Sequence, residues 1–334
     1  MKIFVAVLLA VFSTSATVFA AGMEITPFRT INQSPLVRIF GIPSETEAEV
    51  TTSGKISTSI TQDIANNFAT NTGGGESISM DGESWRWVMS VRYGFGEKFE
   101  AGVEIPLIVQ GGGIWDGLIV DWHKIFGLPQ GGRDIAPRDR ILYSYTKNGI
   151  RKLNMSRSGT GVGDITLTGG MKLYDLQQTD SHDTLAIRTS LKLPTGDSSM
   201  LMGSGSTDLS LYLCGSMTNF TEFGSIAIYG SAGGMALTKG EVLGSQQNNA
   251  AGFGTLGIGW GPAKWISFKL QINGNTPLYH GSSLNEISNG SLMLVSGGAL
   301  KLPGDYHLDI AVSEDIAVNT APDVALHFGL SRKF

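Results

Sequence analysis

Apolar and polar residues alternate in short segments along most of the chain after residue 53. An alternation with a period of two is typical of a β-strand that has one apolar face. In the final segment the apolar positions are Val324, Leu326, Phe328 and Leu330. We predict twelve strands, over residues 54–66, 83–93, 99–109, 161–174, 184–193, 207–215, 223–235, 251–260, 265–273, 291–300, 305–312 and 323–334.

The predicted connections alternate in length. Short links cover residues 94–98, 218–222, 261–264 and 301–304, and the link between the fourth and fifth strands is also fairly short. The longer links cover residues 67–82, 110–160, 194–206, 236–250, 274–290 and 313–322. Most strands are close to the ~9 to 11 residues that a tilted strand needs to cross a bilayer. The pattern predicts an all-β fold: a transmembrane antiparallel β-barrel of about 12 strands, with short periplasmic turns and long extracellular loops.

Aromatic residues gather beside the short links and at the C-terminus. A barrel places such side chains where its wall meets the lipid headgroups, so we expect them to form one girdle. They are Tyr93, Phe95, Phe99, Tyr174, Phe220, Phe223, Trp260, Trp265, Tyr306 and Phe334.

Composition supports the same fold class. Only 16% of the 334 residues are charged, below the ~25% of a soluble domain, as expected where one strand face meets hydrocarbon. The single cysteine, Cys214, excludes an intramolecular disulfide and a multi-cysteine metal site. The net charge of -5 offers no basic surface for nucleic acid. We therefore expect no metal site, no cofactor and no nucleic-acid partner.

The N-terminus predicts export. Lys2 precedes an apolar run over residues 3–12, and the small residues Val18 and Ala20 mark a cleavage site after residue 20. We predict a signal peptide over residues 1–20 and location in the bacterial outer membrane. An anchor helix is disfavoured because the apolar run is short.

Two regions follow the signal peptide. Residues 21–53 form either a periplasmic tail or a plug of the lumen, and residues 54–334 form the barrel. The apolar side chains of the first region favour a packed segment, because a free tail gains nothing by exposing them. They are Phe28, Ile31, Leu36, Val37, Ile39 and Phe40.

The chain ends on Phe334. A terminal strand ending in phenylalanine resembles the signal by which the bacterial barrel assembly machinery takes up its substrates. This resemblance implies that machinery as a partner, and the predicted apolar wall implies contact with outer-membrane lipid and lipopolysaccharide.

Three motifs carry a closer resemblance, over residues 27–35, 123–140 and 191–197. They are similar to an uncharacterised Gram-negative outer-membrane family, catalogued as a domain of unknown function. The third motif is also similar to barrels assigned to aromatic-compound degradation. The resemblance implies the fold and the location, and it transfers no activity and no catalytic residues.

The strand pattern also predicts which charged side chains face the lumen. Such residues either pair across the lumen and hold the barrel together, or line a constriction whose opposed charges select polar solutes. The lumen candidates are Arg86, Arg92, Glu100, Glu104, Lys172, Arg188, Lys192, Lys269, His307, Asp309 and His327.

The link over residues 110–160 is too long to lack structure of its own. Apolar residues at helical spacing, among them Trp115 and Trp122, predict an amphipathic helix of about three turns. This helix either constricts the pore, lies on the outer leaflet or caps the mouth. Residues 140–145 and 149–155 predict a hairpin above the membrane.

We consider a channel or transporter for a small solute, gated by residues 110–160 or by the N-terminal segment, to be the function that fits best. One alternative is an outer-membrane lipid-modifying acyl hydrolase using His307, Asp309 and His327 with Ser313 or Ser331, although no catalytic residue is assigned. The other is a structural or envelope-assembly component. The text GFGTLG at 252–257 lies within a strand rather than before a helix, so it does not indicate dinucleotide binding.

Overall fold

The computed structural model describes residues 23–44, 46–117, 121, 124–125, 136–316, 320–322 and 324–334. The predicted signal peptide, Trp122 and most of the motif at 123–140 lie outside the described residues.

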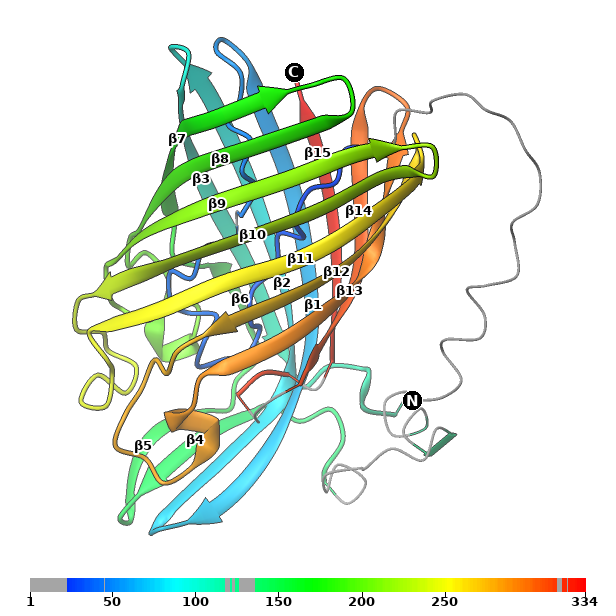
Figure 1. Ribbon diagram of the computed structural model, residues 1–334. Helices are drawn as coiled ribbons and strands as arrows, with labels where there is room; N and C mark the ends of the chain where they lie inside the picture. The colour runs from blue at the N-terminus through cyan, green and yellow to red at the C-terminus, as the bar shows by residue number, and fades with distance from the viewer. Residues whose placement is uncertain are drawn as a thin grey trace.

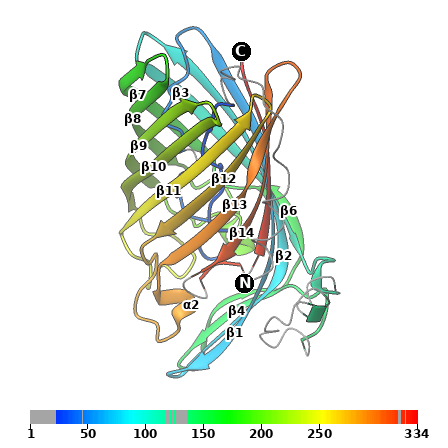
Figure 2. The ribbon, with the colours of Figure 1, turned by 45° about the vertical axis from the view of Figure 1, so that its right-hand side comes forward.

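Twelve antiparallel strands form the wall of a closed barrel (Figures 1 and 2). Each strand pairs with the next along the wall, and the last pairs with the first over ten residues, which closes the sheet. This confirms the predicted fold class and strand number. The wall strands are β1 (Ile56–Gly73), β2 (Glu76–Phe95), β3 (Phe99–Gly111), β7 (Thr166–Gln177), β8 (Ser181–Lys192), β9 (Asp208–Thr221), β10 (Gly224–Leu237), β11 (Ala250–Ala263), β12 (Ile266–Asn275), β13 (Ser291–Leu302), β14 (Tyr306–Asp315) and β15 (Val324–Lys333).

Side chains alternate between the two faces of this wall as predicted. On β2 the side chains of Met89 and Val91 are exposed on the outside, whereas Ser90 and Arg92 are buried on the inside. Aromatic residues beside the short turns, such as Phe223 and Trp265, are likewise exposed. The short turns, including the one between β13 and β14, gather at the end of the barrel where the C-terminus lies (Figure 1). We call this the short-turn end, and the opposite one the long-loop end.

The prediction of a loop over residues 67–82 was wrong. Strands β1 and β2 continue past the wall and join through Gly74 and Gly75, whose φ angles are +57° and +76°. Positive φ at both central residues suits the two-residue turn that matches strand twist. The strands β4 (Leu142–Lys147) and β5 (Ile150–Met155) extend this hairpin into an arm, which confirms the hairpin predicted within residues 110–160.

The strand predicted over residues 161–174 is two strands, β6 (Gly159–Val162) and β7. The interruption covers residues 163–165, and Pro106 on the facing β3 has no N–H to donate there. Thr195 bridges the gap: its Oγ1 donates to the carbonyl of Gly163 at 3.0 Å and accepts from the N–H of Ile165 at 2.9 Å. The motif at 191–197 thus closes the wall where the ladder is broken.

Helical structure is sparse. A 3₁₀ turn, η2 (Ser198–Met200), and a short helix, α2 (Asn285–Ser288), lie in the loops. Of the helix predicted around Trp115, Asp116 and Gly117 are helical, and much of the remainder lies outside the described residues. None of the helices that the structure describes is long and apolar enough to cross a membrane.

Candidate functional site

The lumen is occupied by the chain's own N-terminal segment. Residues 23–44 and 46–53 lie inside the wall: the segment starts at the short-turn end, where Ser225 donates to the carbonyl of Met23, and runs toward the long-loop end. The segment turns over residues 34–40 and returns to the short-turn end, where β1 begins. We call these residues the N-terminal hairpin. Its rising limb, residues 23–33, runs toward the long-loop end, its tip covers residues 34–40, and its falling limb, residues 41–44 and 46–53, returns to the short-turn end.

The rising limb is bound by side chains of β12 at a constant offset. Lys269 Nζ donates to the carbonyl of Thr26 at 2.9 Å, and Asn273 Nδ2 donates to that of Thr30 at 3.1 Å. Between them, Gln271 accepts from the N–H of Phe28 at 2.9 Å and donates to its carbonyl at 3.1 Å. This ladder satisfies limb groups that would otherwise be buried without partners.

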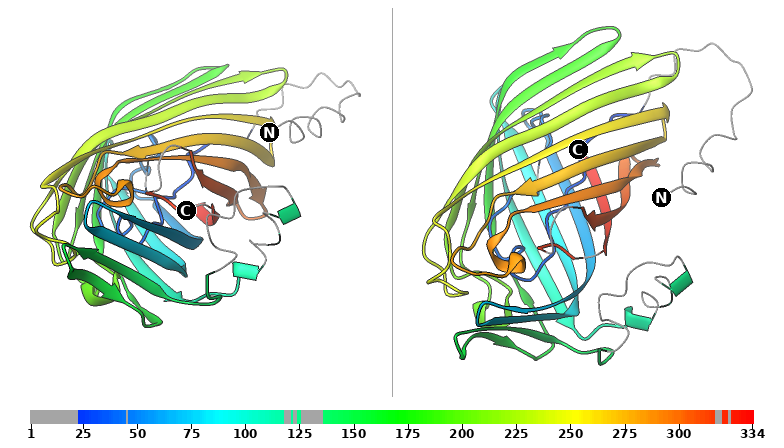
Figure 3. Two further views of the ribbon diagram at one scale, coloured as in Figure 1. Left: turned by 90° about the horizontal axis from the view of Figure 1, so that it is seen from below. Right: turned by 60° about the horizontal axis from the view of Figure 1, so that its bottom comes forward.

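The tip packs into an apolar cluster at the long-loop end. Val37, Ile39 and Phe40 are buried there, and the Phe40 ring meets Tyr279 edge-on with 5.5 Å between centroids. Seen from that end, the arm and the segment bearing α2 lie across the mouth of the barrel (Figure 3). Other members of the cluster are Tyr143, Tyr145, Leu201, Leu243, Leu284 and Ile287.

The falling limb is held by a buried charge cluster from three wall strands. Arg92 on β2 and Arg188 on β8 both contact Glu100 on β3, the former at 3.3 Å. Arg188 also donates from Nε to the carbonyl of Glu47 at 2.6 Å and from Nη2 to that of Glu49 at 2.8 Å. The wall charges therefore bind the hairpin backbone as well as one another.

Gly94 shows how closely this limb passes the wall. A Cβ at Gly94 would lie 2.2 Å from the carbonyl oxygen of Thr51, so any side chain would displace the hairpin. Beside it, the Thr51 N–H donates to Glu100 at 2.6 Å.

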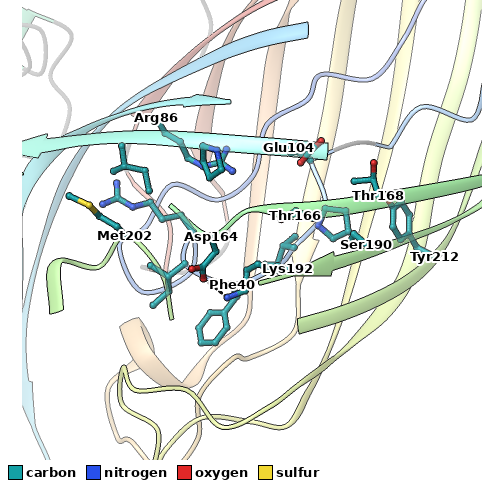
Figure 4. Close-up of a pocket in the computed structure, with 18 residues that line it drawn as sticks. Phe40, Arg86, Glu104, Asp164, Thr166, Thr168, Ser190, Lys192, Met202 and Tyr212 are labelled. Carbon is teal, nitrogen blue, oxygen red and sulfur yellow. Dashed lines mark hydrogen bonds and ion pairs between the residues drawn. The ribbon is translucent and has the colours of Figure 1, made fainter. Parts of the chain in front are cut away.

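A second charge cluster lies next to Gly41, the residue that follows the tip. Lys192 Nζ contacts Asp164 at 2.5 Å and Asp208 at 3.3 Å, and Asp208 accepts from the N–H of Gly41 at 2.8 Å. Figure 4 shows Asp164 and Lys192 approaching each other beside Phe40. The small cavity there, about 30 Å³, has room for about one or two water molecules.

A third group lies beside the rising limb, near the seam between β15 and β1. His327 Nδ1 bonds Asp63 at 2.8 Å, and the Thr30 hydroxyl of the hairpin donates to the same carboxylate at 2.8 Å. Arg86 lies 3.9 Å from Asp63. Glu104, another predicted lumen residue, pairs with Arg29 of the hairpin at 2.9 Å.

The remaining lumen candidates lie nearer the short-turn end. Asp309 pairs with Lys269 at 2.6 Å, and the Lys269 ammonium lies 3.9 Å from the centroid of the Phe28 ring. Lys172 is partly exposed and pairs with Asp175 at 3.1 Å, away from the hairpin. His307 is half-buried and lines a cavity between the hairpin and the wall at the short-turn end.

Three carboxylates of the hairpin surround Lys333 at the end of β15. Its ammonium lies 3.1 Å from Glu24, 3.0 Å from Glu47 and 2.8 Å from Glu49. Burial, together with the Glu24 carboxylate, raises the pKa of Glu49 to about 8 against the opposing effect of Lys333. Against the cost of burial, Lys333 and Arg92 hold the pKa of Glu47 well below its ordinary value.

Sequence reasoning found the wall charges and missed most of their partners. Asp63, Asp164 and Asp208 are buried carboxylates that lie within predicted strands, and a stricter reading of the alternation would have included them. Glu47 and Arg29 lie in a segment without periodicity, so no pattern signalled their contacts. The proposed acyl-hydrolase set is not assembled: His327 bonds Asp63, and Asp309 bonds Lys269. Phe334, the assembly-signal candidate, is exposed, and its N–H donates to the carbonyl of Ile56 at 2.7 Å.

Comparisons with known proteins agree with the fold. The model of a family described as "Protein of unknown function (DUF3187)" matches residues 3–334, whereas no curated protein matches the chain. The COG4313 outer membrane channel from Pseudomonas putida F1 is 14% identical, with 86% of this chain and 98% of that chain covered and a TM-score of 0.54. At this identity the likeness shows the fold alone.

Two other solved structures match less well. A FadL homologue from Pseudomonas aeruginosa is 9% identical over 94% of this chain and 99% of its own, with a TM-score of 0.36. CdiB from Acinetobacter baumannii is 10% identical over 84% of this chain and 60% of its own, with a TM-score of 0.40.

Proposed function

The chain belongs to the DUF3187 family and has the fold of an outer-membrane barrel, and from this premise we propose that it is a channel for a small solute whose N-terminal hairpin is the gate. The observation that carries the proposal is the chemistry that holds the hairpin. Its two limbs are bound to the wall through polar side chains, among them Gln271 and Arg188. Bonds of this kind exchange with water at small net cost, so a limb can detach into a hydrated lumen.

A barrel that needed only mechanical filling would be served by an apolar core, which requires no charge pairs. The wall charges here occur as a set that the hairpin completes: Arg29 meets Glu104, and Arg188 holds two hairpin carbonyls. Withdrawal of the hairpin would leave cations and carboxylates facing each other across water, which is the lining that favours polar solutes. The similar fold of a protein described as an outer membrane channel supports the same proposal.

The proposal includes export through the predicted signal peptide and residence in the outer membrane. The exposed apolar belt, with Met89 and Val91 as examples, suits contact with lipid. Uptake by the barrel assembly machinery through the Phe334 strand belongs to the same proposal.

Planar-bilayer recording tests the gate. The intact barrel should be closed for most of the time, and deletion of residues 23–52 should give steady, discrete openings. A matched variant that lacks residues 112–140 and keeps the hairpin separates the two predicted gates. If only the loop deletion opens the channel, the hairpin is not the gate; if neither deletion conducts, the protein is not a channel.

A further inference from the structure

A cavity of about 310 Å³ lies between the N-terminal hairpin and the wall at the seam of β15 and β1. Its volume falls within the ~300 to 1,000 Å³ of small-molecule sites. The hairpin contributes Thr26, Pro27 and Arg29 to one side. Asp305, in the turn between β13 and β14, also lines it and is largely exposed, so the cavity borders the short-turn rim.

Space remains there because the inward residues of the seam are small. In the strand register Gly329 lies opposite Thr61, and Ser331 lies opposite Ser59. A Cβ at Gly329 would lie 3.4 Å from both His327 Nε2 and the Cβ of Asp309. The absence of a side chain at Gly329 thus leaves this part of the cavity open.

The His327 ring has a hydrogen-bonding group to spare. Its Nδ1 bonds Asp63, while Nε2 is buried and has no partner among the described residues. Buried polar atoms nearly always have a partner in the protein, in water or in a ligand. Nε2 has almost no accessible surface and His327 is not part of the cavity lining, so the polar partners open to an occupant are the lining side chains themselves.

Apart from Arg332, which lies against the Tyr306 ring, the charged side chains that line the cavity are paired. Arg29 meets Glu104, Arg92 meets Glu47 at 3.1 Å, and Asp309 meets Lys269. An ion entering the cavity would compete with these pairs and would lose its hydration. A hydroxyl group loses less, because it both donates and accepts hydrogen bonds. The hydroxyls of Thr61 and Ser331 and the imidazole of His307 line the cavity and supply such partners.

We infer that this cavity is a binding site for a net-neutral, polyhydroxylated solute of about monosaccharide size. The inference rests on the proposed channel function, since it names the solute class that the lumen admits at its short-turn end. The solute would fill the space beside Gly329 and meet Thr61, Ser331 and His307.

Ligand binding to the intact, detergent-solubilised barrel tests this without any conductance. We expect D-glucose to bind saturably in calorimetry or saturation-transfer NMR, with a Kd on the order of millimolar. Gluconate and glucosamine, of similar size but charged, should bind at least about tenfold more weakly. Absence of saturable glucose binding, or tighter binding of either charged analogue, overturns the inference.

A matched pair of glycine variants locates the site. Gly329→Leu places a side chain in the cavity and should weaken glucose binding at least about tenfold. Gly234→Leu makes the same change on the exposed outer face of β10 and should leave binding unchanged. Equal binding by both variants overturns the inference.

Thr61→Val serves if the Gly329 variant fails to fold. It keeps the side-chain shape and removes one hydroxyl, so glucose binding should fall about tenfold, and unchanged binding contradicts the site. The two proposals fail separately. If the intact barrel binds glucose but the hairpin-deleted barrel does not conduct, only the channel proposal is refuted. If the hairpin-deleted barrel conducts but the intact barrel does not bind glucose, only the binding site is refuted.

Discussion

The N-terminal hairpin is held differently at the two ends of the lumen. At the long-loop end its tip is packed among apolar side chains, with Phe40 against Tyr279. Toward the short-turn end its limbs are bound by amides and ion pairs, and a cavity lies beside the rising limb. Apolar packing is lost only when the tip leaves its site, whereas polar bonds can be replaced one at a time by water. One segment thus has a fixed tip and exchangeable limbs.

The largest effect is expected at Arg188, the main anchor of the falling limb. Arg188→Ala leaves Glu100 with less neutralising charge and leaves two hairpin carbonyls without their donor. Removing one member of a buried pair costs about 3–5 kcal/mol. Denaturant unfolding of the detergent-solubilised barrel measures this cost, and a loss below about 1 kcal/mol would show that the cluster does not anchor the limb.

The tip should be nearly as sensitive. Phe40→Ala removes a buried ring from the apolar cluster, and we expect a loss of about 3 kcal/mol. Because the cluster is the part that water cannot replace, the variant should also show more frequent openings in planar bilayers. Wild-type opening frequency in a destabilised Phe40→Ala barrel would mean that the tip does not hold the gate closed.

The β12 ladder should contribute less. Gln271→Met keeps the length of the side chain and removes both bonds to Phe28, with an expected cost of about 1–3 kcal/mol. Gln177→Met, at an exposed site on β7, is the matched control and should change stability by less than about 0.5 kcal/mol. Equal effects of the two substitutions would refute the ladder.

The short-turn end should respond to pH through Glu49. Its pKa is raised to about 8 from the ordinary 4.5, so the docked limb favours the protonated carboxyl. This contribution is complete below about pH 4.5 and is lost as the pH rises through about 8. Limited proteolysis of the hairpin should therefore accelerate between pH 6 and 9.

Glu49→Gln provides the control for that dependence. The glutamine cannot titrate, so the proteolysis rate should lose most of its pH dependence while Glu24, Glu47 and Lys333 remain in place. A Gln variant with the wild-type profile would assign the dependence to another group.

The smallest effect is expected at Lys172, which pairs with Asp175 away from the hairpin. Exposed pairs contribute about 0–1 kcal/mol, so Lys172→Ala should leave both unfolding and opening frequency near wild type. A large change at Lys172 would mean that sensitivity to charge removal is general to the barrel and not specific to the hairpin contacts.

The wall was predictable because lipid on one side and polar groups on the other impose a period of two. The alternation placed Arg92, Glu100 and Arg188 on the inner face, where they lie. It failed at residues 67–82, which form a hairpin beyond the wall. Asparagine, threonine and glycine are frequent there, so the strands show no apolar alternation. It also failed at residues 163–165, because the hydroxyl that bridges the gap belongs to Thr195, far along the chain.

The partners of the wall charges were harder to predict. The hairpin has no regular backbone ladder, so its register depends on side chains such as Gln271 that are distant in sequence. The apolar residues of the segment indicated packing, and Phe28 and Phe40 are indeed buried. The pairing of hairpin charges with wall charges depends on the path of the hairpin through the lumen, which the apolar residues alone do not specify.

The constant offset between β12 and the rising limb has a mechanical consequence. Thr26, Phe28 and Thr30 meet Lys269, Gln271 and Asn273, so the matched positions recur every second residue. A shift of the limb by one residue would place its side chains where its carbonyls now lie. A shift by two residues would present equivalent backbone carbonyls to the same three side chains of β12. Once the tip has left its apolar cluster, the rising limb should therefore move along β12 in increments of about 7 Å.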